Sequence, residues 1–317
     1  MTPVFLFPGQ SSRTPNMIVA GRRLGDWAED LVQRASALVG RDLSAHYQPD
    51  NPNAFARNQD IQVGVFLATH LHLTALTRAG VTAQHSLGLS LGEYNHLVHI
   101  GALTFEAALQ LVDARGAAYD LGPFGMMVSV SPVSVEELEP LCAQVRHLGV
   151  VEIGNLNSPT QQVLSGERAA VEAAARLCES ELYAQTTVIE ERIPMHCSVF
   201  RPAADRLRPA LKRAPWATPN LAYLPNVDAV PHPSPTTADF VATLERHVYS
   251  PVRWRESIDW VVRNVESPQF IEVGPRAVLF NLLQKNWVTR PKLKTDDRDD
   301  LAASLAHVAH EVRADGR

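Results

Sequence analysis

Residues 83–92 read AQHSLGLSLG, in which Ser90 stands between two glycines. This stretch lies between a short predicted strand at 83–89 and a predicted helix at 91–99. A Gly-x-Ser-x-Gly sequence between a strand and a helix is typical of a nucleophile elbow, because the glycines allow the tight turn that presents the serine. The stretch therefore predicts an α/β fold with a reactive serine at the carboxyl edge of a sheet.

Strands and helices alternate on both sides of this turn. Towards the N-terminus, residues 3–7 predict a buried strand that ends at a Pro-Gly turn, and residues 60–79 predict a mostly buried helix. Beyond the turn, residues 105–121 predict an amphipathic helix. This alternation is typical of a doubly wound α/β sheet.

The middle of the chain follows a different order, and the end returns to alternation. The middle elements are expected at 126–131, 134–145, 150–155, 162–165, 168–178 and 185–193. Their order, strand-helix-strand-strand-helix-strand, is that of a ferredoxin-like unit and suggests a small domain inserted into a larger one. Ser134 and Glu137 predict a capping box at the first of these helices. Later helices are expected at 199–212, 237–249, 254–264 and 301–312, strands at 221–227 and 269–273, and a charged, solvated segment at 290–300.

Composition and charge exclude several classes of protein. With 317 residues, 45% of them hydrophobic and 20% charged, and a mean hydropathy of −0.09, the chain is globular and not disordered. A net charge of −5 without a long basic run argues against a nucleic-acid partner. No apolar stretch reaches the ~18 residues that span a bilayer. Three widely spaced cysteines form no zinc pattern or disulfide framework, so we expect a cytoplasmic protein without metal or membrane partner.

Ser90 is the first candidate for a nucleophile. The predicted helix after it directs N-terminal N–H groups at the same point, where they can stabilise an oxyanion. Ser86 also has a glycine two residues later, but Gln84 stands where the elbow needs a glycine. Taken alone, an ordinary N-cap serine in a glycine-rich turn explains the pattern equally well.

A serine nucleophile needs a base, and several histidines compete for that role. His196 follows Pro194 at the predicted return from the inserted domain to the larger one, and the proline disfavours a helix just before it. A loop histidine is more often structural than catalytic. The competing histidines are His85, His96, His99 and His247.

Two more segments have candidate roles near the serine. FPGQSS at 7–12 follows the first strand, so it would lie at the same sheet edge, where Gln10 could contribute a backbone N–H to an oxyanion hole. An ordinary turn is the alternative. Arg115 lies in an otherwise apolar helix. It either pairs with Asp113 or Asp120, or it clamps a substrate carboxylate, which the planar guanidinium suits.

These pieces occur together, in this order and spacing, in one family. From Phe5 to about Leu283 the chain resembles malonyl-CoA:acyl carrier protein transacylases and the discrete acyltransferases of polyketide synthases. A single Gly-x-Ser-x-Gly is a weak signal, whereas eight ordered matches are a strong one. The matches are FPGQSS at 7–12, GLSLGEY at 88–94, ARG at 114–116, NLNSPTQQVLSG at 155–166, PMHCSVFRPAADRL at 194–207, PNVDA at 225–229, YSPVRW at 249–254 and EVGP at 272–275.

The resemblance implies both a fold and the roles of particular residues. The implied fold is an α/β-hydrolase-like large subdomain, residues 1–124 and 194–317, with an inserted ferredoxin-like small subdomain, residues 125–193. The implied site residues are Ser90 as nucleophile, His196 as general base, the N–H groups of Gln10 and Leu91 as oxyanion hole, Arg115, Met195, Tyr119 and Asn157 as substrate-binding residues, and the main-chain carbonyl near His247 as the group that orients the base.

The implied activity is transfer of a malonyl or related carboxyacyl group from coenzyme A to the phosphopantetheine thiol of an acyl carrier protein. It runs through an acyl-serine, serves fatty acid or polyketide synthesis and needs no metal or redox cofactor. The expected partners are an acyl-CoA and an acyl carrier protein. The alternatives are a hydrolase that releases the acyl group to water, transfer of a non-malonyl group between carriers, and a catalytically silent module that docks carriers.

Three positions depart from the family's usual pattern. Leu89 replaces the histidine before the serine, Tyr119 stands where methionine is frequent, and His247 stands where glutamine or asparagine is usual. The residue before the base, here Met195, helps to set acyl selectivity in this family. The resemblance therefore implies the type of reaction more directly than it implies which acyl group is transferred.

Overall fold

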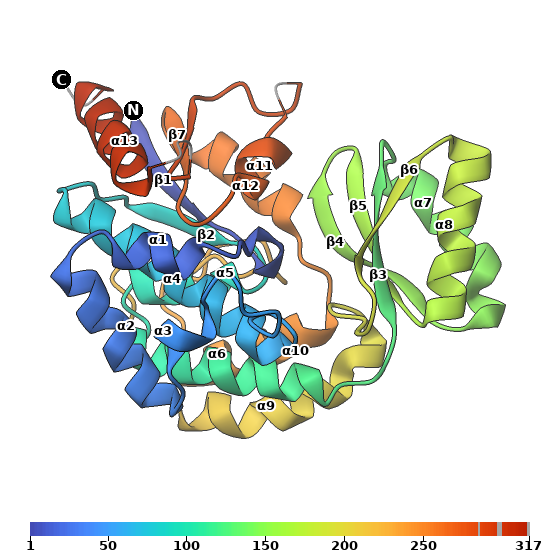
Figure 1. The fold of residues 1–317 in the computed structure, drawn as a ribbon. Coiled ribbons are helices and arrows are strands. Elements are labelled where there is room, and N and C mark those ends of the chain that lie inside the picture. Colours follow the sequence, from blue (N-terminus) through green and yellow to red (C-terminus); the bar gives the residue numbers. More distant parts are fainter. Residues whose placement is uncertain (285, 297–299, 316–317) are drawn as a thin grey trace.

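The computed structural model describes residues 1–284, 286–296 and 300–315, which contain two separate β-sheets (Figure 1). The ends of the chain build one sheet and its middle builds the other, so the chain leaves the first sheet once and returns to it. The first sheet contains β1 (Thr2–Phe7), β2 (His85–Gly88), β7 (Pro268–Glu272) and β8 (Lys292–Lys294). The second contains β3 (Met126–Ser131), β4 (Val151–Ser158), β5 (Gln161–Gly166) and β6 (Gln185–Glu190).

Helices surround the first sheet, and two more pack on the second (Figure 1). No helix of the described ranges has the length and apolar character needed to cross a membrane. Around the first sheet lie α1 (Met17–Arg22), α2 (Asp26–Val39), α3 (Leu43–His46), α4 (Asn58–Arg78), α5 (Gly92–His99), α6 (Phe105–Asp120), α9 (Arg201–Arg213), α10 (Thr237–Tyr249), α11 (Trp254–Asn264), α12 (Val278–Leu282) and α13 (Leu301–Asp315). The second sheet carries α7 (Val135–Val145) and α8 (Arg168–Leu182).

The first sheet is parallel, with the strand order β2-β1-β7-β8. Successive side chains of β1 point to opposite faces. Val4 and Leu6 join a core with residues of α11 and α12, while Phe5 and Phe7 join another with residues of α4 and α13. Parallel strands are usually covered on both faces, which explains the continuous apolar run of β1. The carboxyl ends of β1 and β2 meet at one edge, where the chain turns towards Gln10 and Ser90.

The second sheet is antiparallel, in the order β4-β5-β3-β6. Figure 1 shows α7 and α8 on the face of this sheet that is turned away from the first sheet. A separate apolar core lies between this sheet and its helices. The capping box of Ser134 and Glu137 is confirmed, since each side chain accepts a hydrogen bond from the other residue's N–H.

Two expectations about the later chain are wrong. Residues 221–227 form no strand, because the N–H groups of Leu224 and Asn226 donate to side chains instead of to a neighbouring strand. In the segment 290–300, residues 292–294 are not free in solvent but form β8 beside β7. The ammonium group of Lys292 donates to two backbone carbonyls of the α12 region. Residues 297–299 of that segment lie outside the described residues, and the other predicted elements end within a few residues of the observed ones.

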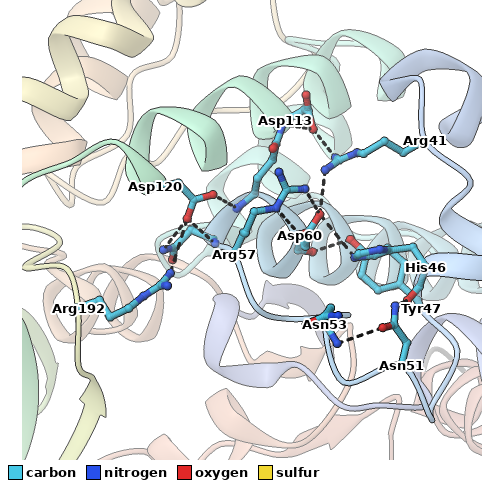
Figure 2. A network of polar contacts seen from close by, with 12 residues as sticks. Arg41, His46, Tyr47, Asn51, Asn53, Arg57, Asp60, Asp113, Asp120 and Arg192 are labelled. Carbon is cyan, nitrogen blue, oxygen red and sulfur yellow. Dashed lines mark hydrogen bonds and ion pairs between the residues drawn. The ribbon is translucent and has the colours of Figure 1, made fainter.

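A network of charged side chains ties α4 to the elements around it (Figure 2). Asp60 is buried on α4 and accepts hydrogen bonds from Arg41 at 2.8 Å and from Arg57 at 2.8 and 3.0 Å. Asp113 of α6 accepts from the same Arg41 at 2.5 Å. Asp120, at the end of α6, accepts from the first two N–H groups of α4 at 2.7 and 3.1 Å. These contacts fix α4, which carries the side chains that hold Gln10.

Replacing Asp60 with asparagine is expected to lower the free energy of unfolding by about 1–3 kcal/mol, the usual cost of losing charged hydrogen bonds in a buried place. Urea denaturation measures this change. The control is Asp205→Asn, because Asp205 is exposed and pairs with Arg208 at the surface. That variant should lose less than about 1 kcal/mol. Equal losses in the two variants would contradict a stabilising role for the buried network.

Candidate active site

Ser90 lies at the turn from β2 to α5 with a backbone φ of +52°, a left-handed conformation that is strained for a non-glycine residue. The flanking glycines make the turn possible. A Cβ on Gly92 would lie 2.0 Å from the carbonyl oxygen of Phe7, and one on Gly88 would lie 2.1 Å from the backbone of Gly92. Asn226 holds the turn, because its Oδ1 accepts from the N–H of Ser90 at 2.7 Å and its Nδ2 donates to the carbonyl of Gly88 at 2.5 Å.

The side chains of Ser90 and His196 are in hydrogen-bond contact. Oγ of Ser90 lies 2.8 Å from Nε2 of His196, and Nδ1 of the same ring lies 2.8 Å from the carbonyl oxygen of His247. Because a carbonyl only accepts, Nδ1 carries the proton and Nε2 is left as the acceptor. The ring is therefore oriented to take a proton from the serine hydroxyl.

The environment of His196 keeps its imidazole uncharged. Burial lowers the pKa of His196 to about 3, and the charge of Arg115 acts in the same direction, whereas the hydrogen bond to the His247 carbonyl raises it. At neutral pH the ring is therefore in the form that can accept a proton.

Arg115 reaches Ser90 from α6. It is buried, and its Nη2 donates to Oγ of Ser90 at 3.2 Å. Its guanidinium carbon lies 4.3 Å from the ring centroid of Tyr119 and 5.6 Å from that of Tyr94. Within the described ranges, Nη1 of Arg115 is buried without a hydrogen-bond partner.

The ion pairs that the sequence allowed for Arg115 are not formed. Asp113 bonds to Arg41 and Gln59 instead, and Asp120 caps α4. A buried guanidinium with an unpartnered nitrogen is costly unless an anion meets it. A substrate carboxylate could complete its hydrogen bonds.

Two backbone N–H groups beside the serine donate to no other described residue, those of Gln10 and Leu91. The N–H of Ser90 itself is taken by Asn226. The side chain of Gln10 is held from α4, since it donates to Asn58 at 3.3 Å and accepts from Gln62 at 3.4 Å. Free N–H groups at this edge could receive the charge of an oxyanion.

A pocket opens over Ser90 between the two sheets. Gln10 and Leu89 line it from the first sheet's edge, and Ile189 lines it from the second sheet. Among the predicted substrate-binding residues, Met195 lines the pocket, whereas Arg115, Tyr119 beside it and Asn157 are not part of the lining. Oδ1 of Asn157 is buried without a partner in the part of the chain that the structure describes.

The competing side chains have other partners. Oγ of Ser86 lies 2.7 Å from Nδ1 of His96 and 2.9 Å from Nδ1 of His99. Nε2 of His96 accepts from the N–H of Leu224, so this cluster holds the loop after α9 against α5. His85 stands at the start of β2, at the opposite end of that strand from the elbow.

Sequence reasoning missed two residues of the site, Asn226 and Glu93. Both stand inside motifs that carry the resemblance, at 225–229 and 88–94, but neither residue type signals a role in acyl transfer by itself. Their positions become informative only once the fold brings them beneath Ser90.

The described residues contain no cluster of three or more histidine, cysteine or acidic side chains that could hold a metal ion. The three cysteines, Cys142, Cys178 and Cys197, are buried free thiols, and burial raises the pKa of each. What the site does offer is a serine hydroxyl, a neutral imidazole, two free N–H groups and a guanidinium.

A serine at an elbow, bonded to a histidine at the edge of a parallel sheet, is the arrangement of enzymes that move acyl groups through an acyl-serine. The acyl transferase domain family matches residues 4–301. The malonyl CoA-acyl carrier protein transacylase of Escherichia coli (strain K12) is 29% identical over 308 residues, which cover 95% of this chain and 98% of that protein. The chain belongs to the acyl transferase domain family and, within it, to the malonyl-CoA:acyl carrier protein transacylases.

Solved structures agree with this assignment. The malonyl CoA-acyl carrier protein transacylase from Clostridium perfringens has a TM-score of 0.89 at 28% identity, over 99% of this chain and 100% of that one. A malonyl-transacylase in complex with its type II polyketide synthase acyl-carrier protein has a TM-score of 0.88 at 27% identity, over 97% and 100%. The likeness therefore extends over both sheets.

Proposed function

We propose that this protein is an ACP S-malonyltransferase, which moves a malonyl group from coenzyme A to the phosphopantetheine thiol of an acyl carrier protein. Its relatives in Escherichia coli and Clostridium perfringens are malonyl CoA-acyl carrier protein transacylases, and a further relative is bound to its acyl-carrier protein. The observation that carries the proposal is Arg115. Its buried guanidinium donates to Oγ of Ser90 at 3.2 Å and keeps Nη1 without a partner among the described residues.

In the first half-reaction, Oγ of Ser90 attacks the thioester carbonyl while Nε2 of His196 takes the hydroxyl proton. The N–H groups of Gln10 and Leu91 receive the negative charge on the carbonyl oxygen, and each such donor contributes roughly 10²–10³ in rate. The intermediate then collapses, the carbon–sulfur bond breaks, and the coenzyme A thiolate takes the proton from His196. A malonyl-serine ester remains.

In the second half-reaction, the carrier's phosphopantetheine thiol attacks this ester by the reverse path, which predicts ping-pong kinetics. The steps move only protons and an acyl group between oxygen and sulfur, so we propose that they use no metal or redox cofactor. The three free cysteines support a reducing, cytoplasmic location.

We further propose that the chain divides into an α/β-hydrolase-like large subdomain, residues 1–124 and 194–317, and a ferredoxin-like small subdomain, residues 125–193. The parallel sheet and its elbow support the first assignment. The second is supported by the element order β3-α7-β4-β5-α8-β6, the antiparallel pairing and the separate core. His196 follows the small subdomain directly, so the pocket lies at the junction.

Intact-mass spectrometry after incubation with a panel of acyl-CoAs tests the proposed activity. We expect a malonyl adduct on the protein that disappears when an acyl carrier protein bearing phosphopantetheine is added, with a matching gain of mass on the carrier. Release of free malonate in place of carrier loading would indicate a hydrolase. Acetylation in preference to malonylation would refute the malonyl assignment.

Arg115→Ala is expected to reduce malonyl transfer at least ~10-fold and to leave acetyl transfer unchanged or improved. A charge-assisted, two-pronged bond to the malonyl carboxylate contributes roughly 1.5–3 kcal/mol, and about 1.4 kcal/mol corresponds to one decade. Acetyl-CoA has no carboxylate to lose. Parallel loading assays with the two esters measure the difference.

Two controls accompany this variant. Arg115→Lys should recover only part of the malonyl activity, because a point charge does not reproduce the planar fork. A melting curve separates recognition from stability. Equal losses for both esters together with a lower melting temperature would mean that Arg115 only supports the helix.

A further inference from the structure

Glu93 is a fully buried carboxyl group beneath the catalytic pair, in the first turn of α5. Two donors and a ring nitrogen converge on it. The hydroxyl of Tyr223 donates to Oε1, the N–H of Asn226 donates to Oε2 at 3.2 Å, and Nδ1 of His247 lies 3.2 Å from Oε2. Burial raises the pKa of Glu93 to about 7, while the bonds from Tyr223 and Asn226 lower it.

One arm of this cluster leads to the nucleophile. Glu93 fixes the backbone of Asn226, whose side chain holds both the N–H of Ser90 and the carbonyl of Gly88. Asn226 therefore stabilises the left-handed conformation of Ser90. It also accepts the hydrogen bond from the N–H of Ser90, so that N–H is not available to an oxyanion and Leu91 is the elbow residue with a free N–H.

The other arm leads to the base. The ring of His247 stacks on that of His196, with centroids 5.0 Å apart and an interplanar angle of 26°. Burial lowers the pKa of His247 well below its ordinary value, so the ring is neutral. Its Nδ1, 3.2 Å from Oε2 of Glu93, is the ring nitrogen that faces the carboxyl group, while its Nε2 is buried without a partner in the described ranges. The carbonyl of the same residue accepts from Nδ1 of His196.

We propose that Glu93 is a positioning residue for the acyl transfer, which holds the nucleophile through Asn226 and the base through His247. The N–H of Glu93 donates to the carbonyl of Ser90 at 3.1 Å, but its carboxyl group makes no described hydrogen bond to Ser90 or His196, so the carboxyl group acts through Asn226 and His247. The arrangement gives the side chain of His247 a function, in addition to that of its carbonyl. This inference rests on the proposed function only in assuming that Ser90 and His196 react.

Glu93→Gln keeps the size of the side chain but exchanges one acceptor for a donor, which opposes the two donors, Tyr223 and Asn226, that bond to it. We expect the rate of Ser90 labelling by a fluorophosphonate to fall about 10- to 100-fold, as is usual for a misplaced reacting group. The rate of acylation by malonyl-CoA should fall equally, at an unchanged half-saturating concentration. Wild-type protein that is labelled but not malonylated would refute the proposed function and leave this inference standing.

Glu272 offers a matched control. It is also fully buried, accepts from the N–H groups of Leu279 and Phe280, and has a pKa raised by burial to about 7, but it bonds to no residue of the site. Glu272→Gln should lower the melting temperature and leave the labelling rate of the folded fraction unchanged. The inference is overturned if Glu93→Gln is labelled as fast as wild type, or if Glu272→Gln slows labelling to the same extent.

A second pair of variants tests the His247 arm without altering the carboxyl group. His247→Leu removes the ring nitrogen that faces Glu93 and should slow labelling at least ~10-fold. His247→Gln supplies a donor and should recover most of that loss. Equal rates in the two variants would contradict the proposed use of the His247 side chain.

Discussion

Replacing Ser90 with alanine is expected to abolish formation of the acyl-enzyme while the fold stays intact. The substitution removes only the hydroxyl group. Its hydrogen-bond partners, Nε2 of His196 and Nη2 of Arg115, belong to the site and not to the apolar core. Strained functional residues often reduce stability, so the melting temperature should stay the same or rise. Intact-mass spectrometry with malonyl-CoA measures the acyl adduct directly.

Ser86→Ala is the matched control for the nucleophile. Ser86 lies on the preceding strand and its hydroxyl is bonded to His96 and His99. This variant should lose some stability and keep its acyl adduct. The nucleophile would be Ser86 if the Ser90→Ala variant still gained an acyl adduct on a serine and the double variant, Ser86→Ala with Ser90→Ala, did not.

His196→Ala is expected to slow acylation by about 10²–10⁴-fold, the range for loss of a general base, or by more where base and nucleophile act as a unit. Because burial lowers the pKa of His196 to about 3, protonation of this ring should slow the wild-type reaction only at acid pH, whereas a change of rate near pH 7 would report on Glu93. Single-turnover acylation at several pH values measures both effects.

His85→Ala is the control for this second prediction. His85 lies at the far end of β2 and is half-buried. Its loss should leave the acylation rate within about threefold of wild type. A larger loss for His85→Ala than for His196→Ala would overturn the assignment of the base.

The elements around the elbow could be predicted because local sequence decides them. The turn at GLSLG needs its two glycines, and the apolar run of β1 favours a strand that is buried on both faces. Residues 221–227 misled the prediction, because an apolar stretch does not reveal that its N–H groups will meet side chains on α5. β8 was missed because its lysines suggest a solvated segment. The strand is stabilised by its pairing with β7, which the local sequence does not show.

The site was predictable only as far as residue type carries chemistry. A serine at an elbow and a histidine after the inserted unit suggest a nucleophile and a base, and the family resemblance implied their pairing. Asn226 and Glu93 act by holding other groups. Their roles therefore become visible only when the fold brings segments that are far apart in the sequence into contact. Asp113 and Asp120 are close to Arg115 in the sequence but bind other groups, Arg41 and the start of α4. Those groups come from distant segments, so the sequence around Arg115 did not reveal them.

The pairing of β1 with β7 bears on how the protein is made. Thr2 pairs with Pro268 and Leu6 with Glu272, so the sheet that carries the serine joins segments synthesised far apart in time. On the ribosome, β1 can pair with β2 long before β7 emerges. Until then the nascent chain presents one open edge of an apolar strand, which invites pairing with other chains. Contacts of such sequence separation form slowly, so residues 2–7 stay open to wrong pairing for as long as β7 is missing.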